Sequence, residues 1–299
     1  MSGYHRPVML TEALEGLAIR PDGVYVDVTF GGGGHSRAIL AQLGPEGRLL
    51  AFDQDQDALQ NTIKDDRFML IPHNFRHLQR FLRLHKAGPV DGILADLGIS
   101  SHQIDTPERG FSTRYEARLD MRMQQKGALD AFTVVNTYSE QQLQQVFKQY
   151  GELPGAYRLA KAIVQQRALA PIETTEQLKS AVAPFAKGKQ AQYFAQLFQA
   201  IRIEVNQELE ALKEFLQQSA EVLKQGGRLV VIAYHSLEDR LVKNYIKKGA
   251  FEGEALKDFY GQPLMPFKTV VGKALQPSDQ EIQDNPRARS ARLRIAEKR

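Results

Sequence analysis

Residues Val24–His35 read Val-Tyr-Val-Asp-Val-Thr-Phe-Gly-Gly-Gly-Gly-His, and this stretch decides the fold. The alternating β-branched residues at its start predict a buried strand. The glycines Gly31–Gly34 add no side chains to a core, but they let the backbone turn sharply and let a ligand lie directly on it. A helix is predicted next, from Ser36 to Leu43. This pattern is typical of a βα turn that binds a nucleotide or nucleoside, and the alternative is a plain surface loop.

Acidic residues end two further predicted strands. Asp53 ends the second strand, 19 residues after Gly34, where a carboxylate accepts hydrogen bonds from ribose hydroxyls; the alternative is a helix cap. Asp96 ends the fourth strand, Val90–Asp96. The carboxyl ends of the first and fourth strands flank the crevice of a doubly wound sheet, so we expect Asp96 to face the glycine turn. Asp96 is therefore the main catalytic candidate.

Two other strand ends carry candidate residues. Phe75 follows the third strand and is placed to stack on an adenine ring, or else is an ordinary core residue. His235 and Ser236 follow the fifth strand, Gly226–Tyr234, and point toward the same crevice. A Ser/His hydrolase is excluded because adjacent residues cannot form the nucleophile–base pair and no nucleophile elbow is present. Ser236 is also placed to cap the next helix, a role compatible with substrate binding.

The α/β pattern stops between Asp105 and Lys189, where the sequence shows only helical periodicity. Capping boxes begin two of these helices, at Ser139–Gln142 and Thr174–Gln177. We therefore predict an inserted all-helical, substrate-recognition domain over residues 105–189. Residues 1–104 and 190–299 would form the ligand-binding domain, closed by an antiparallel strand pair near the C-terminus.

Arginines gather in two segments that are candidates for phosphate contacts, although solvated charges are the alternative. The first group leads the helical segment and the second lies near the C-terminus: Arg109, Arg114, Arg118, Arg122, and Arg287, Arg289, Arg292, Arg294.

Composition excludes several classes of protein. The 299 residues contain no cysteine, which excludes a disulfide framework, a thiolate metal site and a cysteine nucleophile. No apolar run reaches the roughly 18 residues of a membrane helix, and no signal peptide begins the chain. We therefore expect a cytoplasmic protein with no metal site. The net charge of +4 is compatible with an anionic partner.

Two cofactor classes fit a glycine turn followed by strand-end acids. A dinucleotide calls for the spacing G-x-G-x-x-G to seat its pyrophosphate, and a P-loop calls for Gly-Lys-Ser/Thr; neither is present. S-adenosylmethionine has no phosphate but a cationic sulfonium and an amino-acid tail. Contiguous glycines preceded by an aspartate therefore suit S-adenosylmethionine better than a dinucleotide.

Seven motifs follow one another along the chain: Tyr4-His5-x-Pro-Val8, Asp27-x-Thr29-Phe30-Gly-x-Gly33-Gly34-His35-Ser36, Asp96-Leu97-Gly98-x-Ser100-Ser101, Arg109-Gly110-Phe111-Ser112, Asp120-Met121-Arg122-Met123, His235-Ser236-Leu237-Glu238-Asp239-Arg240 and Asn285-Pro286-Arg287-Ala288-Arg289-Ser290. In this order they resemble the MraW-type family of ribosomal RNA small-subunit methyltransferases H, over essentially the whole chain.

The resemblance implies a class I (Rossmann-like) methyltransferase sheet with the inserted helical domain. It implies an S-adenosylmethionine-dependent enzyme that methylates the exocyclic N4 of a decoding-centre cytidine in 16S ribosomal RNA. The expected partner is that RNA within the assembled small subunit, with no membrane; the oligomeric state stays open, a homodimer being one option. By motif match the cofactor-binding residues would be Gly33, Gly34, His35, Asp53, Phe75, Asp96 and Gln103.

The exocyclic amine of cytosine is a poor nucleophile because its lone pair is delocalised into the ring. The enzyme must therefore orient the amine toward the methyl group and accept its hydrogen bond, and no covalent enzyme intermediate is required. We hypothesise that Asp96 contacts the cofactor or the amine and that His235 and Ser236 hold the base. Many amine methyltransferases carry Asp/Asn-Pro-Pro-aromatic after strand four, whereas this chain has Asp96-Leu97-Gly98-Ile99. Alternatives are an amine methyltransferase of DNA or another RNA, a nicotinamide oxidoreductase and a non-catalytic RNA-binding module.

Overall fold

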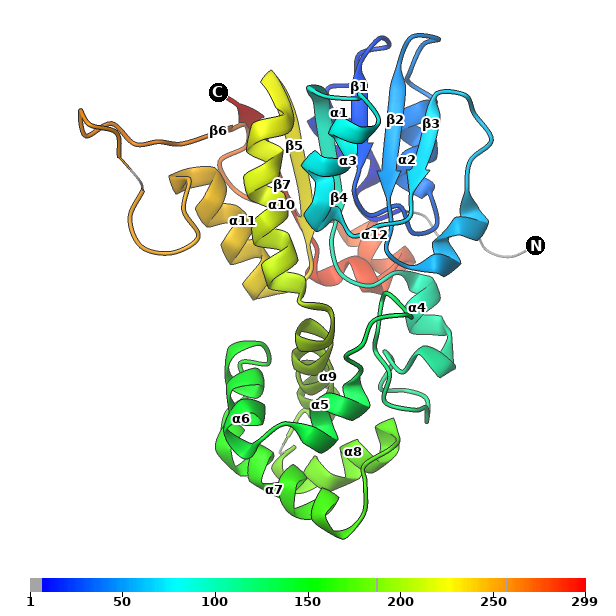
Figure 1. Cartoon of the computed structure of the whole chain (residues 1–299), viewed down its shortest axis with the longest axis vertical. Coiled ribbons are helices and arrows are strands. Elements are labelled where there is room, and N and C mark those ends of the chain that lie inside the picture. The colour runs from blue at the N-terminus through cyan, green and yellow to red at the C-terminus, as the bar shows by residue number, and fades with distance from the viewer. Residues whose placement is uncertain (1–6, 187, 256) are drawn as a thin grey trace. The chain divides into compact units, whose positions relative to one another are not determined.

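The computed structural model describes residues 7–186, 188–255 and 257–299 (Figure 1). Tyr4 and His5 of the first motif, with Arg6, lie outside these residues. The chain divides into two compact units. The first comprises Met1–Gly98 and Leu209–Arg299, and the second comprises Ile99–Glu208.

The first unit is built on one sheet of seven strands in the order β3-β2-β1-β4-β5-β7-β6. The first five pair in parallel, and β7 runs antiparallel to both β5 and β6. This arrangement confirms the predicted α/β fold, including its C-terminal antiparallel pair. The strand bounds are β1 Val24–Asp27, β2 Arg48–Phe52, β3 Phe68–Ile71, β4 Val90–Asp96, β5 Leu223–Ala233, β6 Phe267–Thr269 and β7 Arg292–Lys298.

Helices and short 3-10 turns cover this sheet. Leu17, Ile39, Leu94 and Ile295 belong to one buried cluster, which joins α1 and α2 to the sheet. Elsewhere, Arg76 pairs with Glu214 at 2.6 Å and so links η2 to α10, the helix that lies in front of β5 in Figure 1. The bounds are α1 Leu10–Leu17, α2 Gly34–Leu40, η1 Gln56–Asn61, η2 Phe75–His77, α3 Leu78–Leu84, α10 Glu208–Val222, α11 Ser236–Lys248, α12 Asp279–Asp284 and η5 Pro286–Ser290.

The second unit is helical in the residues that the structure describes, as the sequence predicts for this region. Both predicted capping boxes are present, at Ser139–Gln142 and Thr174–Gln177. The core includes Phe147, Leu159 and Leu197. The elements are α4 Ser101–Asp105, η3 Pro107–Arg109, α5 Ala131–Thr137, α6 Glu140–Gln149, α7 Ala156–Leu169, α8 Thr175–Val182, η4 Ala183–Phe185 and α9 Gln190–Asn206.

The second unit extends beyond residues 105–189 because α9 packs its apolar face into the helical core, through Leu197 and Ile201. The sequence predicts one bent or two consecutive helices over residues 190–225, which return the chain to the sheet. These residues form two helices, α9 and α10, separated at Gln207 in a left-handed conformation (φ 50°). No helix in the described ranges is long and apolar enough to span a bilayer.

Candidate active site at the carboxyl ends of the strands

The glycine turn begins at Asp27, the last residue of β1. This buried carboxylate accepts a hydrogen bond from the Ser36 hydroxyl at 2.7 Å and one from the Thr29 amide at 3.1 Å. Asp27 therefore links the residues before the glycines to those after them. Burial raises the pKa of Asp27.

Three glycines of the turn, Gly32, Gly33 and Gly34, differ in what surrounds them. A Cβ on Gly34 would meet the Pro7 ring, and a Cβ on Gly33 would meet the Arg37 guanidinium; Gly33 also has φ +74°. A Cβ on Gly32 would meet no atom of the described residues within 4 Å, and Gly32 is exposed. Gly33 and Gly34 are thus required by the protein itself, whereas Gly32 leaves backbone open to a ligand.

Asp53 follows β2 and is joined directly to the turn. Its carboxylate accepts hydrogen bonds from the Gly31 amide at 2.7 Å and from the Asp55 amide at 2.8 Å. Each carboxylate oxygen keeps a second lone pair for a ligand donor. Burial raises the pKa of Asp53 to about 6.

Asp96, the last residue of β4, lies beside the end of β1, where the strand order predicted it. Its amide donates to the Thr29 hydroxyl at 2.7 Å. One carboxylate oxygen, Oδ2, lies 3.7 Å from Nδ1 of His35. Nε2 of the buried His35 is 3.1 Å from the Val8 carbonyl, and because a carbonyl only accepts, Nε2 carries the proton.

Tyr234 is a functional candidate that our sequence reasoning missed. Its hydroxyl donates to Oδ1 of Asp96 at 2.7 Å, and its amide donates to Oε2 of Glu238 at 3.0 Å. Burial raises the pKa of Asp96, and burial together with this carboxylate raises that of Tyr234 well above its usual value. The available signal was its position: Tyr234 directly follows β5, the strand that pairs with β4.

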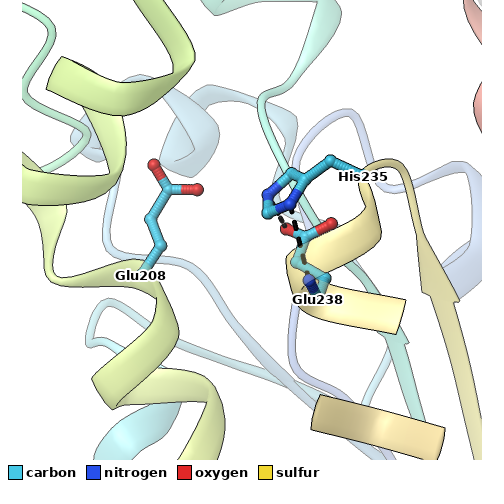
Figure 2. Close-up of side chains that lie close together, drawn as sticks. All are labelled: Glu208, His235 and Glu238. Atoms are coloured by element: carbon cyan, nitrogen blue, oxygen red, sulfur yellow. Dashed lines mark hydrogen bonds and ion pairs between the residues drawn. The ribbon is translucent and has the colours of Figure 1, made fainter. Parts of the chain in front are cut away.

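His235, not Ser236, is the N-cap of α11. Nδ1 of His235 accepts the Glu238 amide at 3.4 Å, while Ser236 is exposed and is the first residue of the helix. The expectation that Ser236 caps this helix is therefore wrong, because the extended His235 backbone aims the imidazole at the first turn. Figure 2 shows His235 and Glu238 side by side.

The protonation site of His235 follows from the cap. Nδ1 accepts a hydrogen bond, so in the neutral ring Nε2 carries the proton. Nε2 lies 3.2 Å from Oε1 of Glu238, but it makes no hydrogen bond to the described part of the chain. His235 thus has a buried ring donor beside the carboxyl group of Glu238, which is itself buried. Glu208, also drawn in Figure 2, belongs to the second unit, where it pairs with Arg202 at 2.8 Å.

The remaining predicted cofactor residues are Phe75 and Gln103. Phe75 begins η2 and packs edge-on against Phe215, with ring centroids 5.4 Å apart. Gln103 belongs to the second unit, where its amide oxygen accepts the Ser100 amide in a capping box. Their roles toward a cofactor stay predictions.

Several of the candidate arginines have protein partners. Arg109 is buried and donates to the Arg122 and Met123 carbonyls, and Arg122 forms a two-bond ion pair with Asp120. Arg294 does the same with Asp239. These three arginines form hydrogen bonds or ion pairs with other parts of the protein. The side chains of Arg114, Arg118, Arg289 and Arg292 are exposed to solvent.

The chemistry of this group of residues suits a cationic ligand. At the strand ends lie the carboxylates of Asp27, Asp53, Asp96 and Glu238, and Nδ1 of His35 is 3.7 Å from the Asp96 carboxylate. Buried carboxylates attract positive charge, and they repel a pyrophosphate. The residues present therefore fit the sulfonium and ammonium groups of S-adenosylmethionine, with the open Gly32 backbone beside them.

Comparisons with known proteins agree with this chemistry. The model of the MraW methylase family matches residues 2–299. Ribosomal RNA small subunit methyltransferase H of Flavobacterium johnsoniae is 60% identical over 296 residues, which cover 99% of this chain and 98% of that protein. The proteins of the same name from Christiangramia forsetii and Bacteroides fragilis strain YCH46 are 58% and 54% identical, each over 99% of this chain and 98% of their own length. The chain therefore belongs to the MraW methylase family.

Proposed function

We propose that this protein transfers a methyl group from S-adenosylmethionine to the exocyclic N4 of a decoding-centre cytidine in small-subunit ribosomal RNA. The observation that carries the proposal is the 60% identity, along nearly the whole chain, to a protein named ribosomal RNA small subunit methyltransferase H. The cluster of carboxylates at the strand ends supports the choice of cofactor.

The bound cofactor would supply an electrophilic methyl group. The protein residues would bind the cofactor and orient the target amine. Gly32 and Asp53 would hold the cofactor, the first through open backbone and the second through its free lone pairs. Asp96 would receive the hydrogen bond of the attacking amine, which gives up a proton when it gains a methyl group. The Tyr234 hydroxyl keeps the Asp96 carboxylate in one orientation.

His235 would hold the base as a hydrogen-bond donor. Its Nε2 carries the proton in the neutral ring, since Nδ1 is engaged by the helix. The O2 and N3 atoms of cytosine are acceptors, so a donor at this position complements them. Ser236, exposed beside it, would add a second polar contact to the base. The target base must leave its stack to reach this site.

A transfer assay with labelled S-adenosylmethionine tests the proposal. The acceptors are small subunits that lack the modification, the naked ribosomal RNA and single-stranded DNA, with the modified nucleotide mapped afterwards. We expect label on one cytidine N4 of the ribosomal RNA. Label on DNA alone, or on another RNA alone, would support the alternative amine methyltransferases and refute the proposed substrate.

Two variants test the residue roles. We expect Asp96→Asn and His235→Ala to slow single-turnover transfer at saturating cofactor, by at least tenfold each. Near-normal rates in both variants would refute these roles.

A further inference from the structure

The segment between α11 and β6 ends in a tight turn, residues 257–263, which we name the aromatic hairpin. The Asp258 amide donates to the Gln262 carbonyl at 2.9 Å, and the Asp258 carboxylate accepts the amides of Tyr260 and Gln262 at 2.9 and 2.8 Å. Lys257 and Pro263 form an antiparallel bridge, and Gly261 has φ +78°. Backbone and side-chain hydrogen bonds therefore define the shape of this turn.

The aromatic hairpin presents two rings to solvent. Phe259 is 98% exposed and Tyr260 is 85% exposed, the highest values among the large hydrophobic residues in the described chain. Their ring centroids lie 5.7 Å apart in an edge-to-face arrangement. Two adjacent rings kept out of the core forgo the hydrophobic stabilisation that burial provides, so this arrangement calls for a ligand.

The base of the same segment is anchored. Phe251 stacks on Tyr245 of α11, with ring centroids 4.9 Å apart, and its carbonyl accepts a hydrogen bond from Asn244 at 2.8 Å. Phe267, where the chain enters β6, packs edge-on against the same Tyr245. The orange ribbon in Figure 1 stands out from α11 and β6 between these two anchors. The rings are thus held on a fixed base rather than on a free tail.

The charged residues of the hairpin and of the elements beside it indicate which kind of partner the rings bind. Residues 249–266, between α11 and β6, carry one lysine and three acidic residues, of which Asp258 is used within the turn, and the flanking residues 243–248 and 267–273 add five lysines and no acid. Lys257, next to the rings, is exposed, as are Lys248 and Lys268 on the stem. Aromatic rings beside lysines match single-stranded RNA, whose bases stack on the rings while its phosphates meet the cations.

Size argues against a protein partner. Two aromatic side chains offer about 150–250 Å² each, whereas a stable protein interface buries about 800 Å² on each side. Of the neighbouring exposed residues, Lys257 and Gln262 are polar, and Leu264, 54% exposed, adds only one more apolar side chain, so the surface stays below the size of such an interface.

We propose that the aromatic hairpin is an RNA-binding element in which Phe259 and Tyr260 stack on unpaired bases and Lys257 contacts the backbone. The identity of the RNA as small-subunit ribosomal RNA rests on the proposed function. The binding chemistry does not, since it follows from the rings and the charges.

The chain contains no tryptophan, so Phe259→Trp introduces a single reporter. We expect its emission to be quenched saturably by a single-stranded RNA oligonucleotide, with weaker binding as salt rises. Leu84→Trp is the matched control, because Leu84 is 66% exposed at the end of α3, outside the predicted substrate-recognition domain. Its emission should be unaffected by the RNA.

A second measurement uses Phe259→Ala/Tyr260→Ala, with Leu84→Ala as control. Loss of stacking should weaken binding of the ribosomal RNA by roughly 5- to 100-fold and raise KM, while kcat stays unchanged. Unquenched emission, equal affinity of the double variant, or an emission shift with anionic vesicles in place of RNA would overturn the proposal. Quenching by RNA without methyl transfer by the unmodified protein would instead overturn the proposed function and support the hairpin.

Discussion

The bond between Tyr234 and Asp96 allows a quantitative prediction about the site. Tyr234→Phe removes only the hydroxyl that donates to Asp96 at 2.7 Å and keeps the ring. A hydrogen bond to a charged group contributes about 1.5–3 kcal/mol, and one pKa unit corresponds to about 1.4 kcal/mol. Because the bond favours the ionised carboxylate, its loss should raise the pKa of Asp96.

The sign of the effect on activity follows from the proposed role of Asp96. If the ionised carboxylate receives the hydrogen bond of the amine, the variant needs a higher pH to reach the same ionised fraction. We expect the acid limb of the pH–rate profile to move upward, so that the rate on that limb falls roughly 10- to 150-fold, with the rate recovering at high pH. The loss of folding stability should likewise be present where Asp96 is ionised and shrink as the pH falls through its pKa.

The assay is single-turnover methyl transfer at saturating cofactor, measured from acid to alkaline pH in both proteins. Tyr25→Phe is the matched control, since its hydroxyl accepts the Arg20 amide at 2.8 Å, away from the carboxylates of the site. The control should keep the acid limb of the unmodified protein. An unmoved limb in Tyr234→Phe, or a rate loss equal at every pH, would refute the reasoning.

Three further predictions concern the cofactor site and the fold. Since the pKa of Asp53 is about 6, affinity for S-adenosylmethionine measured by calorimetry should rise with pH up to that value and then level off; Asp53→Asn should abolish this dependence, and a dependence retained in the variant would exclude Asp53 as its source. Gly32→Ala should leave thermal unfolding unchanged yet weaken cofactor binding at least tenfold because its methyl group covers the open backbone, whereas Gly34→Ala should destabilise the protein against Pro7; equal effects on unfolding would contradict the difference in their surroundings. Arg294→Met should cost about 3–5 kcal/mol in chemical denaturation because it leaves the Asp239 carboxylate unpaired, and adding Asp239→Asn should restore most of that loss; a single variant as stable as the unmodified protein would refute a stabilising ion pair.

Local patterns in the sequence predicted the elements of the site correctly. The β-branched run before Gly31 forms β1, and Asp96 ends β4 beside it. These features could be read from the chain because strand periodicity, glycine turns and capping boxes depend on neighbouring residues. The motifs identified the family for the same reason, since each is a short run of consecutive residues, and the family comparison agrees.

The partners of individual side chains could not be read in this way. Arg122 and Arg294 resemble candidate phosphate ligands in the sequence, yet each forms an ion pair within the protein. The second of these pairs joins residues 55 positions apart, and no periodicity encodes such a contact. The sequence also could not show that the helical unit extends to Glu208. The apolar face of α9 could pack equally well against a helical core or against a sheet.

The sequence by itself determined the strand–glycine–helix turn, the strand-end acids and the family, because each of these depends on residues that are close together along the chain. Only the tertiary structure decided that Tyr234 binds Asp96, that His235 rather than Ser236 caps α11, and that Gly32 alone among Gly32–Gly34 leaves space for a ligand. Those facts depend on which strands become neighbours and on which atoms fill the space around each backbone position. They come from long-range packing, which the order of residues specifies only through the whole fold.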